Sequence, residues 1–110
     1  MEGFIKGDIV VVPFPFSDLT RAKRRPALVI ARLKGEDVIL CQITSQRIRD
    51  EYAISIEGND FETGALKQKS NVRPNRIFTG DRRIVLYRIG HLKPEKISDV
   101  TDKIIEILKQ

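Results

Sequence analysis

The sequence has little of the residue types that many catalytic and metal-binding sites use. Its 110 residues include one cysteine, one histidine and no tryptophan. A single cysteine excludes an internal disulfide and fits a reducing compartment. A zinc site built from Cys and His ligands is excluded, as is a two-histidine ribonuclease mechanism within one chain. Cys41 lies in an apolar run, so we expect an inert thiol, and we interpret His91 as a packed or solvated histidine.

The chain also lacks the longer patterns that mark cofactor binding and membrane insertion. Neither common glycine-rich phosphate loop occurs, and the acidic residues are scattered rather than gathered as a magnesium site requires. The longest apolar runs have the length of strands, and the first residues do not form a signal peptide. We therefore expect no cofactor, no metal site, no membrane association and a cytoplasmic location.

What the sequence does have is positive charge. The formal net charge is +5 at pH 7, and residues 21–88 hold 15 Lys and Arg against 8 Asp and Glu. Four of the five residues from Arg21 to Arg25 are basic, and they directly precede a proline and an apolar run. A phosphate backbone is the commonest target of such a surface. A basic loop can equally be an ordinary solvated surface.

The pattern of apolar residues predicts one domain, residues 1–110, with several short strands and one helix. Strands are predicted at 9–12, 27–33, 38–43, 52–56 and 83–92, with exposed loop at 17–24, loop or turn at 57–70, and an extended segment at 71–81. We expect that segment to break near Pro74, and we interpret Pro13 and Pro15 as marking a strand end or an edge.

Apolar residues three or four positions apart predict an amphipathic helix at the end of the chain. Its stripe is Ile97, Val100, Ile104 and Leu108, and Pro94 suits its first turn. Short strands and one terminal helix together predict a mainly β fold, in the form of a small barrel or curled sheet.

Two polar clusters flank the second and third predicted strands. One is "KRRP", residues 23–26, and the other is "ITSQ", residues 43–46. If the two strands form a hairpin, the start of one lies beside the end of the other, which places Arg25 near Thr44. A guanidinium binds phosphate through two hydrogen bonds, and the hydroxyls of Thr44 and Ser45 can add more. Taken alone, each cluster is also typical of a plain polar turn.

Two phenylalanines flank Pro15, and these rings suit base stacking. Aromatic side chains stack on unpaired bases in single-strand binders, and Phe14 and Phe16 could do so here. Such residues more often belong to a core or an interface.

The ordered set "GDIVVVPFPFSD", "KRRPALVI" and "VILCQITSQ", followed by "SNVRPNRIFTGDRRIVLYRIGHL", resembles the MazF/PemK toxins of type II toxin–antitoxin systems. The resemblance covers essentially the whole chain. It implies an SH3-like, mostly antiparallel β-barrel with a C-terminal α-helix, and a homodimer. It also implies a metal-independent endoribonuclease that cuts single-stranded RNA, chiefly mRNA, at a short sequence and leaves 2′,3′-cyclic phosphate and 5′-hydroxyl ends. The implied partner is a cognate antitoxin with an acidic, disordered C-terminal segment.

The resemblance also assigns roles to individual residues. The arginine before the proline falls on Arg25 and the threonine of the I-T-x-Q stretch on Thr44, and both are expected to be catalytic. The other expected RNA-binding residues are Ser17, Asp18, Lys23, Arg24, Ser45, Gln46, Arg76 and Thr79. Many relatives carry an Arg-Thr pair late in the chain, whereas here Phe78 precedes Thr79, and Arg76 is a possible replacement for that arginine.

Two alternatives stay open from the sequence. The related CcdB family shares the barrel but poisons DNA gyrase through its C-terminal helix; its expected end is an apolar-aromatic tail, whereas this chain ends "IIEILKQ". An RNA-binding relative that has lost catalysis is the other alternative, and the departure at Phe78 keeps it open. The pair of Arg-Pro and I-T-S-Q motifs favours the nuclease.

Overall fold

The computed structural model describes residues 3–14 and 23–110. The described elements, in chain order, are β1 (Asp8–Phe14), β2 (Lys23–Arg32), β3 (Asp37–Thr44), β4 (Ile54–Ile56), the 3₁₀ turn η2 (Gly58–Asp60), β5 (Phe61–Gly64), β6 (Ser70–Asp81), the 3₁₀ turn η3 (Arg82–Ile84), β7 (Tyr87–Leu92) and α1 (Pro94–Leu108). The mainly β fold with one terminal helix is the one that the sequence predicts.

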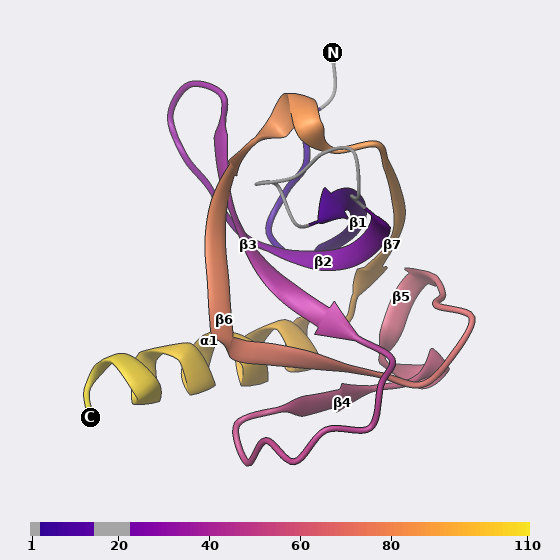
Figure 1. Cartoon of the computed structure of the whole chain (residues 1–110), viewed down its shortest axis with the longest axis vertical. Helices are drawn as coiled ribbons and strands as arrows, with labels where there is room; N and C mark the ends of the chain where they lie inside the picture. Colours follow the sequence, from indigo (N-terminus) through magenta and orange to yellow (C-terminus); the bar gives the residue numbers. More distant parts are fainter. Residues whose placement is uncertain (1–2, 15–22) are drawn as a thin grey trace.

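The strands form one curled antiparallel sheet. Its seven described strands follow the order β4-β6-β3-β2-β1-β7-β5, so the hairpin of β2 and β3 lies near the middle. Figure 1 shows the sheet curling around β1 and β2, with α1 beside β6. This half-barrel with its helix confirms the expected SH3-like architecture and places the ends of β2 and β3 at a rim.

Both faces of the sheet are apolar, because alternate residues of the central strands point to opposite sides. The face toward α1 is built on cross-strand partners such as Ile9, Leu28 and Cys41, each fully buried. The opposite face, inside the curl, holds Val10, Ala27, Val29, Val38 and Leu40. The central strands are therefore fixed from both sides, which makes the rim that they carry rigid.

The helix confirms most of the predicted stripe. Pro94 occupies its first turn, Val100 and Ile104 are buried, and Ile97 packs against the same cluster. Leu108, the last member of the stripe, is 71% exposed, so including it was wrong. Ile107 in the same turn is partly buried, so the last turn presents Leu108 to the outside.

The predicted strands are present, but pairing with neighbouring strands makes some of them longer or shorter than predicted. β1 runs past Pro13 to Phe14, because it stays paired with β2 there. Its pairing with β7 ends at Val11, so Pro13 lies at an edge of β1 that has no paired strand. Lys23 and Arg24 belong to β2 rather than to a loop. β7 begins only at Tyr87, because η3 occupies the start of the predicted strand.

The segment at 57–70, predicted as loop or turn, contains strand β5. This prediction was wrong because β5 owes its conformation to a distant partner: Phe61 pairs with Leu92 of β7, and its ring is buried in the core. Composition alone, rich in Gly, Asn and Asp, gives no signal of that pairing.

β6 is irregular where the sequence places Pro74. The strand is continuous, but its partners on β3 jump: Ile43 pairs with Val72, whereas Cys41 pairs with Ile77. The expected break is thus a bulge in the pairing rather than an end of the strand. The bulge pushes Asn75 and Arg76 outward, toward the same rim.

The two ends of α1 give a matched test of its packing. We expect Ile104→Ala to lower the free energy of unfolding by about 2–5 kcal/mol, because it leaves a cavity in the core, and Leu108→Ala to change it by less than about 0.5 kcal/mol. Urea unfolding of both variants, followed by circular dichroism, measures the difference. Equal losses would contradict the packing of α1 described here.

Candidate active site

The register of β2 against β3 brings the two predicted polar clusters together. Ala27 pairs with Gln42, and Arg25 and Thr44, two residues further along each strand, line the same two hollows. The paired ladder starts at Ala27, directly after Pro26, which has no backbone N–H to donate. β2 meanwhile stays paired with β1 as far as Lys23. From Pro26 back to Lys23, β2 therefore pairs with β1 but no longer with β3, and a space opens between β2 and β3.

Three adjoining hollows follow this opening, and together we call them the rim groove. The first, of about 410 Å³, lies between the rim and the segment after β5; its polar lining is Arg24, Arg25, Thr44, Ser45, Lys67, Gln68, Ser70 and Tyr87. The second, of about 340 Å³, shares Arg25 and Thr44 with the first and adds Phe14, Lys23, Gln42 and Gln46. Arg25 and Thr44 thus lie where these two hollows meet.

A third hollow continues the groove along β6. It shares Phe14 and Gln42 with the second hollow, and its remaining lining is Asn75, Arg76, Ile77 and Phe78. The rim groove is therefore an elongated track with Arg25 and Thr44 near its middle. Such a shape suits an extended polymer better than a compact small molecule.

The rim groove is positively charged along its length. Its five cationic residues, Lys23, Arg24, Arg25, Lys67 and Arg76, form no ion pair with any carboxylate in residues 3–14 and 23–110. The described lining includes no Asp or Glu. Cations that no internal acid neutralises attract polyanions.

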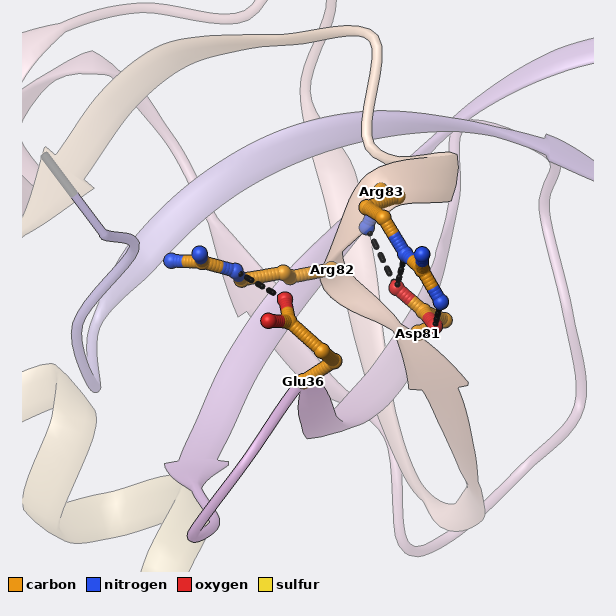
Figure 2. Close-up of polar contacts among 4 residues, drawn as sticks. All are labelled: Glu36, Asp81, Arg82 and Arg83. Atoms are coloured by element: carbon orange, nitrogen blue, oxygen red, sulfur yellow. Dashed lines mark hydrogen bonds and ion pairs between the residues drawn. The ribbon is translucent and has the colours of Figure 1, made fainter. Parts of the chain in front are cut away.

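Some arginines outside the groove are paired with carboxylates. Figure 2 shows two such pairs beside η3: Arg82 donates through Nε to Glu36 Oε2 at 2.6 Å, and Arg83 holds both carboxylate oxygens of Asp81. Hydrogen bonds from Arg83 lower the pKa of Asp81 to about 2. Arg83 binds Asp81 within the turn after β6, and Arg82 binds Glu36 in the turn between β2 and β3. A carboxylate therefore already balances the charge of each of these arginines.

The Thr44 hydroxyl is oriented by the turn that follows β3. Its oxygen accepts the backbone N–H of Gln46 at 3.1 Å. Among the described residues the hydroxyl donates to no protein group, which leaves its proton for a ligand oxygen in the groove. Thr44 and Arg25 together offer a hydroxyl donor and a guanidinium fork to one phosphate.

The structure gathers most of the predicted site residues and separates one. Besides Arg25 and Thr44, the rim groove contains Lys23, Arg24, Ser45, Gln46 and Arg76. Thr79 is exposed on β6 but does not line the groove, so it is not brought to the site. Ser17 and Asp18 lie outside the described residues, as does Phe16, and their expected roles stay predictions.

Several groove residues were missed in the sequence. Gln42 had a signal, since it is a lone polar residue inside the apolar run "VILCQI". Lys67 and Gln68 had none, because only the pairing of β5 with β7 and of β6 with β4 brings their segment to the rim. Asn75 reaches the groove through the bulge of β6, which only the distant register reveals.

The lone histidine and cysteine are structural, as predicted. His91 Nδ1 lies 2.8 Å from Oδ1 of the fully buried Asp8, whose other oxygen accepts the Ile5 backbone N–H. Cys41 is fully buried, and its thiol donates to the Arg73 carbonyl at 2.9 Å. Burial raises the pKa of Cys41 to about 12, so the thiolate needed of a nucleophile does not form near neutral pH.

Metal ligands and membrane spans give no further candidates in the part of the chain that the structure describes. No three His, Cys, Asp or Glu side chains gather there in a way that could hold a metal ion. No helix there has the length and apolar character that crossing a bilayer requires.

The family follows from a match along nearly the whole chain. A family model described as PemK-like, MazF-like toxin of type II toxin–antitoxin system matches residues 5–108. The chain belongs to this family. The match spans both strands of the central hairpin, the bulged strand β6 and the helix. No match was found among curated proteins.

Solved structures of MazF proteins share the fold. MazF from Deinococcus radiodurans aligns with a TM-score of 0.77 at 18% identity, covering 100% of both chains. An endoribonuclease in complex with its cognate antitoxin, from a mycobacterial species, aligns with a TM-score of 0.76 at 13% identity, covering 97% of this chain and 96% of that one. The toxin MazF-mt6 of Mycobacterium tuberculosis aligns with a TM-score of 0.73 at 17% identity, covering 93% and 96%.

The buried thiol predicts a specific dependence of stability on pH. The pKa of the Cys41 thiol is higher in the folded chain than in the unfolded chain. Above about pH 9 the unfolded chain therefore loses the thiol proton, whereas the folded chain keeps it. We expect the free energy of unfolding to fall with rising pH above that point, by at most about 1.4 kcal/mol per pH unit from this group. Urea unfolding of wild type and Cys41→Ala between about pH 8 and 10.5 isolates it. Parallel pH curves for the two proteins would contradict the burial of this thiol.

Proposed function

We propose that this chain is a toxin that acts as a sequence-specific endoribonuclease on single-stranded RNA, chiefly mRNA. The observation that carries the proposal is the presence of Arg25 and Thr44 together in the middle of an elongated, positively charged groove whose described lining includes no Asp or Glu. Membership of the toxin family and the likeness to a protein described as an endoribonuclease support it.

The reaction uses a nucleophile that the RNA itself carries. The 2′-hydroxyl attacks the adjacent phosphorus, the bond to the 5′-oxygen of the next nucleotide breaks, and the products are a 2′,3′-cyclic phosphate and a 5′-hydroxyl. The 2′-hydroxyl gives up one proton and the leaving 5′-oxygen gains one. The chain then needs to hold the nucleotide in line and stabilise the extra charge on the phosphate oxygens.

Arg25 and Thr44 are placed for that electrostatic task. The guanidinium of Arg25 offers two parallel N–H donors to the phosphate oxygens, and the Thr44 hydroxyl offers a third from the neighbouring strand. Both side chains project from strands whose backbone the two-sided core holds, so their backbone positions are set before the substrate arrives. Lys23, Arg24, Ser45 and Gln46 hold the flanking nucleotides in this proposal.

The proposed reaction requires no metal ion. Cationic, hydroxyl and amide side chains line the described groove, which is a donor set for phosphate oxygens rather than the carboxylate set that magnesium prefers. DNA lacks the attacking 2′-hydroxyl, so it is not a substrate under this mechanism.

Cleavage of a long, weakly structured RNA in excess EDTA tests the proposal. We expect cuts at one short recurring motif, and a loss of about a hundredfold or more in rate in Arg25→Ala and in Thr44→Ala, because each removes a positioned donor. Mapping of the cut sites and end-group analysis of the products measure both results.

Matched controls lie on exposed strand positions away from the groove. Arg32→Ala changes the other end of β2, and Thr63→Ala changes an exposed residue of β5; both should cut like wild type. Cleavage that EDTA abolishes, or efficient cleavage of DNA, would contradict the mechanism. Intact RNA with a bound gyrase would instead support the CcdB-like alternative, and salt-dependent RNA binding without cleavage would support the catalytically weak relative.

We further propose that the toxin is a homodimer neutralised by a cognate antitoxin through an acidic C-terminal segment. The cations of the rim groove, which pair with no carboxylate in residues 3–14 and 23–110, suit such a segment, and Ile105 and Leu108 leave an exposed apolar end on α1. One chain of this size also buries only a modest core.

Sedimentation equilibrium should give twice the 12.6 kDa mass of one chain. An acidic peptide from the gene neighbour of the toxin should inhibit RNA cleavage competitively, and less strongly as salt rises, because screening weakens charge pairing. A monomer at micromolar concentration, or inhibition that leaves RNA binding intact, would count against these partners.

A further inference from the structure

The link between β5 and β6 forms a wall of the first hollow. We call its residues 65–69 the strap, and Figure 1 shows it as the loop between these two strands. Gly64, at its start, pairs with β7 at a φ of +73°, and a Cβ there would lie 2.0 Å from the Ile89 carbonyl oxygen. Ser70, at its end, is buried, and its hydroxyl donates to the Gln68 carbonyl at 3.0 Å. Neighbouring strands therefore fix both ends of the strap, and only glycine fits the first of them.

Between its two ends the strap belongs to no strand or helix. Leu66 is half-buried and packs against the core cluster that faces α1, which holds the strap on the sheet. The other residues of the strap are exposed. A strap held in this way keeps its place beside the rim, while its polar side chains remain accessible to a ligand.

The two lysines of the strap have different surroundings. Lys67 lines the first hollow together with Arg25 and Thr44, and it forms no ion pair with a carboxylate in residues 3–14 and 23–110. Lys69, two residues later, does not line that hollow, and its Nζ lies 3.9 Å from Oε1 of Glu57. The strap thus brings one cation to the rim groove and pairs the other with an acid outside it.

Lys67 lies to one side of the proposed cleavage position. Arg25 and Thr44 line both the first and the second hollow, whereas Lys67 lines only the first of these two. RNA carries a negative charge at each nucleotide, so a strand whose cleaved phosphate is held by Arg25 and Thr44 brings a neighbouring phosphate into the first hollow. An ammonium is a compact point charge that binds phosphate without the two-pronged geometry of a guanidinium. Lys67 therefore suits a phosphate that is bound but not cleaved.

We propose that Lys67 binds the RNA phosphate next to the cleaved one and so sets the position of the strand in the groove. The inference rests on the proposed function for the identity of the polymer, and it goes further by assigning a residue that lies outside the hairpin of β2 and β3. The charge of this neighbouring phosphate does not change during the reaction. Lys67 therefore stabilises the bound substrate and the transition state equally, which lowers KM and leaves kcat unchanged.

Three variants test the assignment. Lys67→Gln removes the charge but keeps a long side chain, and Lys67→Arg keeps the charge. Lys69→Gln is the matched control, because it removes a lysine of the same strap that does not line the first hollow. Both positions are exposed, so each variant should fold as stably as wild type, which thermal unfolding checks.

Binding is measured at several salt concentrations, with a single-stranded 2′-O-methyl RNA of mixed sequence that lacks the attacking hydroxyl. We expect Lys67→Gln to weaken binding roughly tenfold at low salt, the effect of losing one hydrogen bond to a charged group. The slope of the logarithm of the binding constant against the logarithm of the salt concentration should become shallower by about 0.7, because one phosphate fewer is neutralised. Lys67→Arg and Lys69→Gln should keep the slope of wild type.

Cleavage kinetics give an independent readout. We expect Lys67→Gln to raise KM roughly tenfold with kcat unchanged, and Lys67→Arg to restore KM, whereas Arg25→Ala should lower kcat. A merely structural role of Lys67 would not divide KM from kcat in this way, and restoring the charge alone would not rescue it.

The outcomes separate this inference from the proposed function. Cleavage by wild type, with KM and the salt slope unchanged in Lys67→Gln, would overturn the role of Lys67 and leave the nuclease standing. An equal change of slope in Lys69→Gln, or a lower kcat at unchanged KM in Lys67→Gln, would overturn that role as well. Salt-dependent binding that requires Lys67, without cleavage by wild type, would support the phosphate site and overturn the nuclease. Absence of both binding and cleavage would overturn both.

Discussion

The site depends on one constraint, which is where the pairing of β2 with β3 begins. Pro26 cannot donate a backbone hydrogen bond, and the ladder starts at Ala27. Before that point β2 follows β1 instead, so the two strands of the hairpin diverge and the rim groove opens between them. Arg25 and Thr44, which lie two positions beyond the last pair of this ladder, both line the opening. The "KRRP" cations therefore occupy the part of β2 that pairs with β1 alone and faces the groove.

The core holds this arrangement from both faces of the sheet. A shift of one residue would move every side chain of a strand to the other face. On β1 and β2 it would exchange Ile9 and Leu28 on one side with Val10 and Ala27 on the other, and so disrupt the packing of both clusters. Donors on such strands start from a fixed backbone position when charge develops on a phosphate. The stability of the core and the positions of the proposed catalytic residues thus both depend on the pairing of the central strands.

A feature of this structure can be predicted from the sequence when the residues that determine it lie close together along the chain. The juxtaposition of Arg25 and Thr44 was predictable, since the hairpin that creates it is local and its turn lies around Gly35. Strand β5 and the bulge of β6 were not, because β5 pairs with β7 and the bulge arises from the register of β6 on β3. Lys67 and Asn75 enter the groove only through these distant pairings. Family resemblance gave the roles of single residues, but it could not place Thr79 outside the groove.

The groups proposed for the cleavage step and the residues of β6 in the groove are held by different constraints. Arg25 and Thr44 lie on β2 and β3, the two strands of the local hairpin. Asn75 reaches the groove where the partners of β6 on β3 shift, whereas Phe78 lies in the regular ladder opposite Leu40. A bulge re-aims the side chains that it carries and is a designed feature of a fold. A substitution at Asn75 would therefore change the lining of the groove without changing the register of β2 on β3.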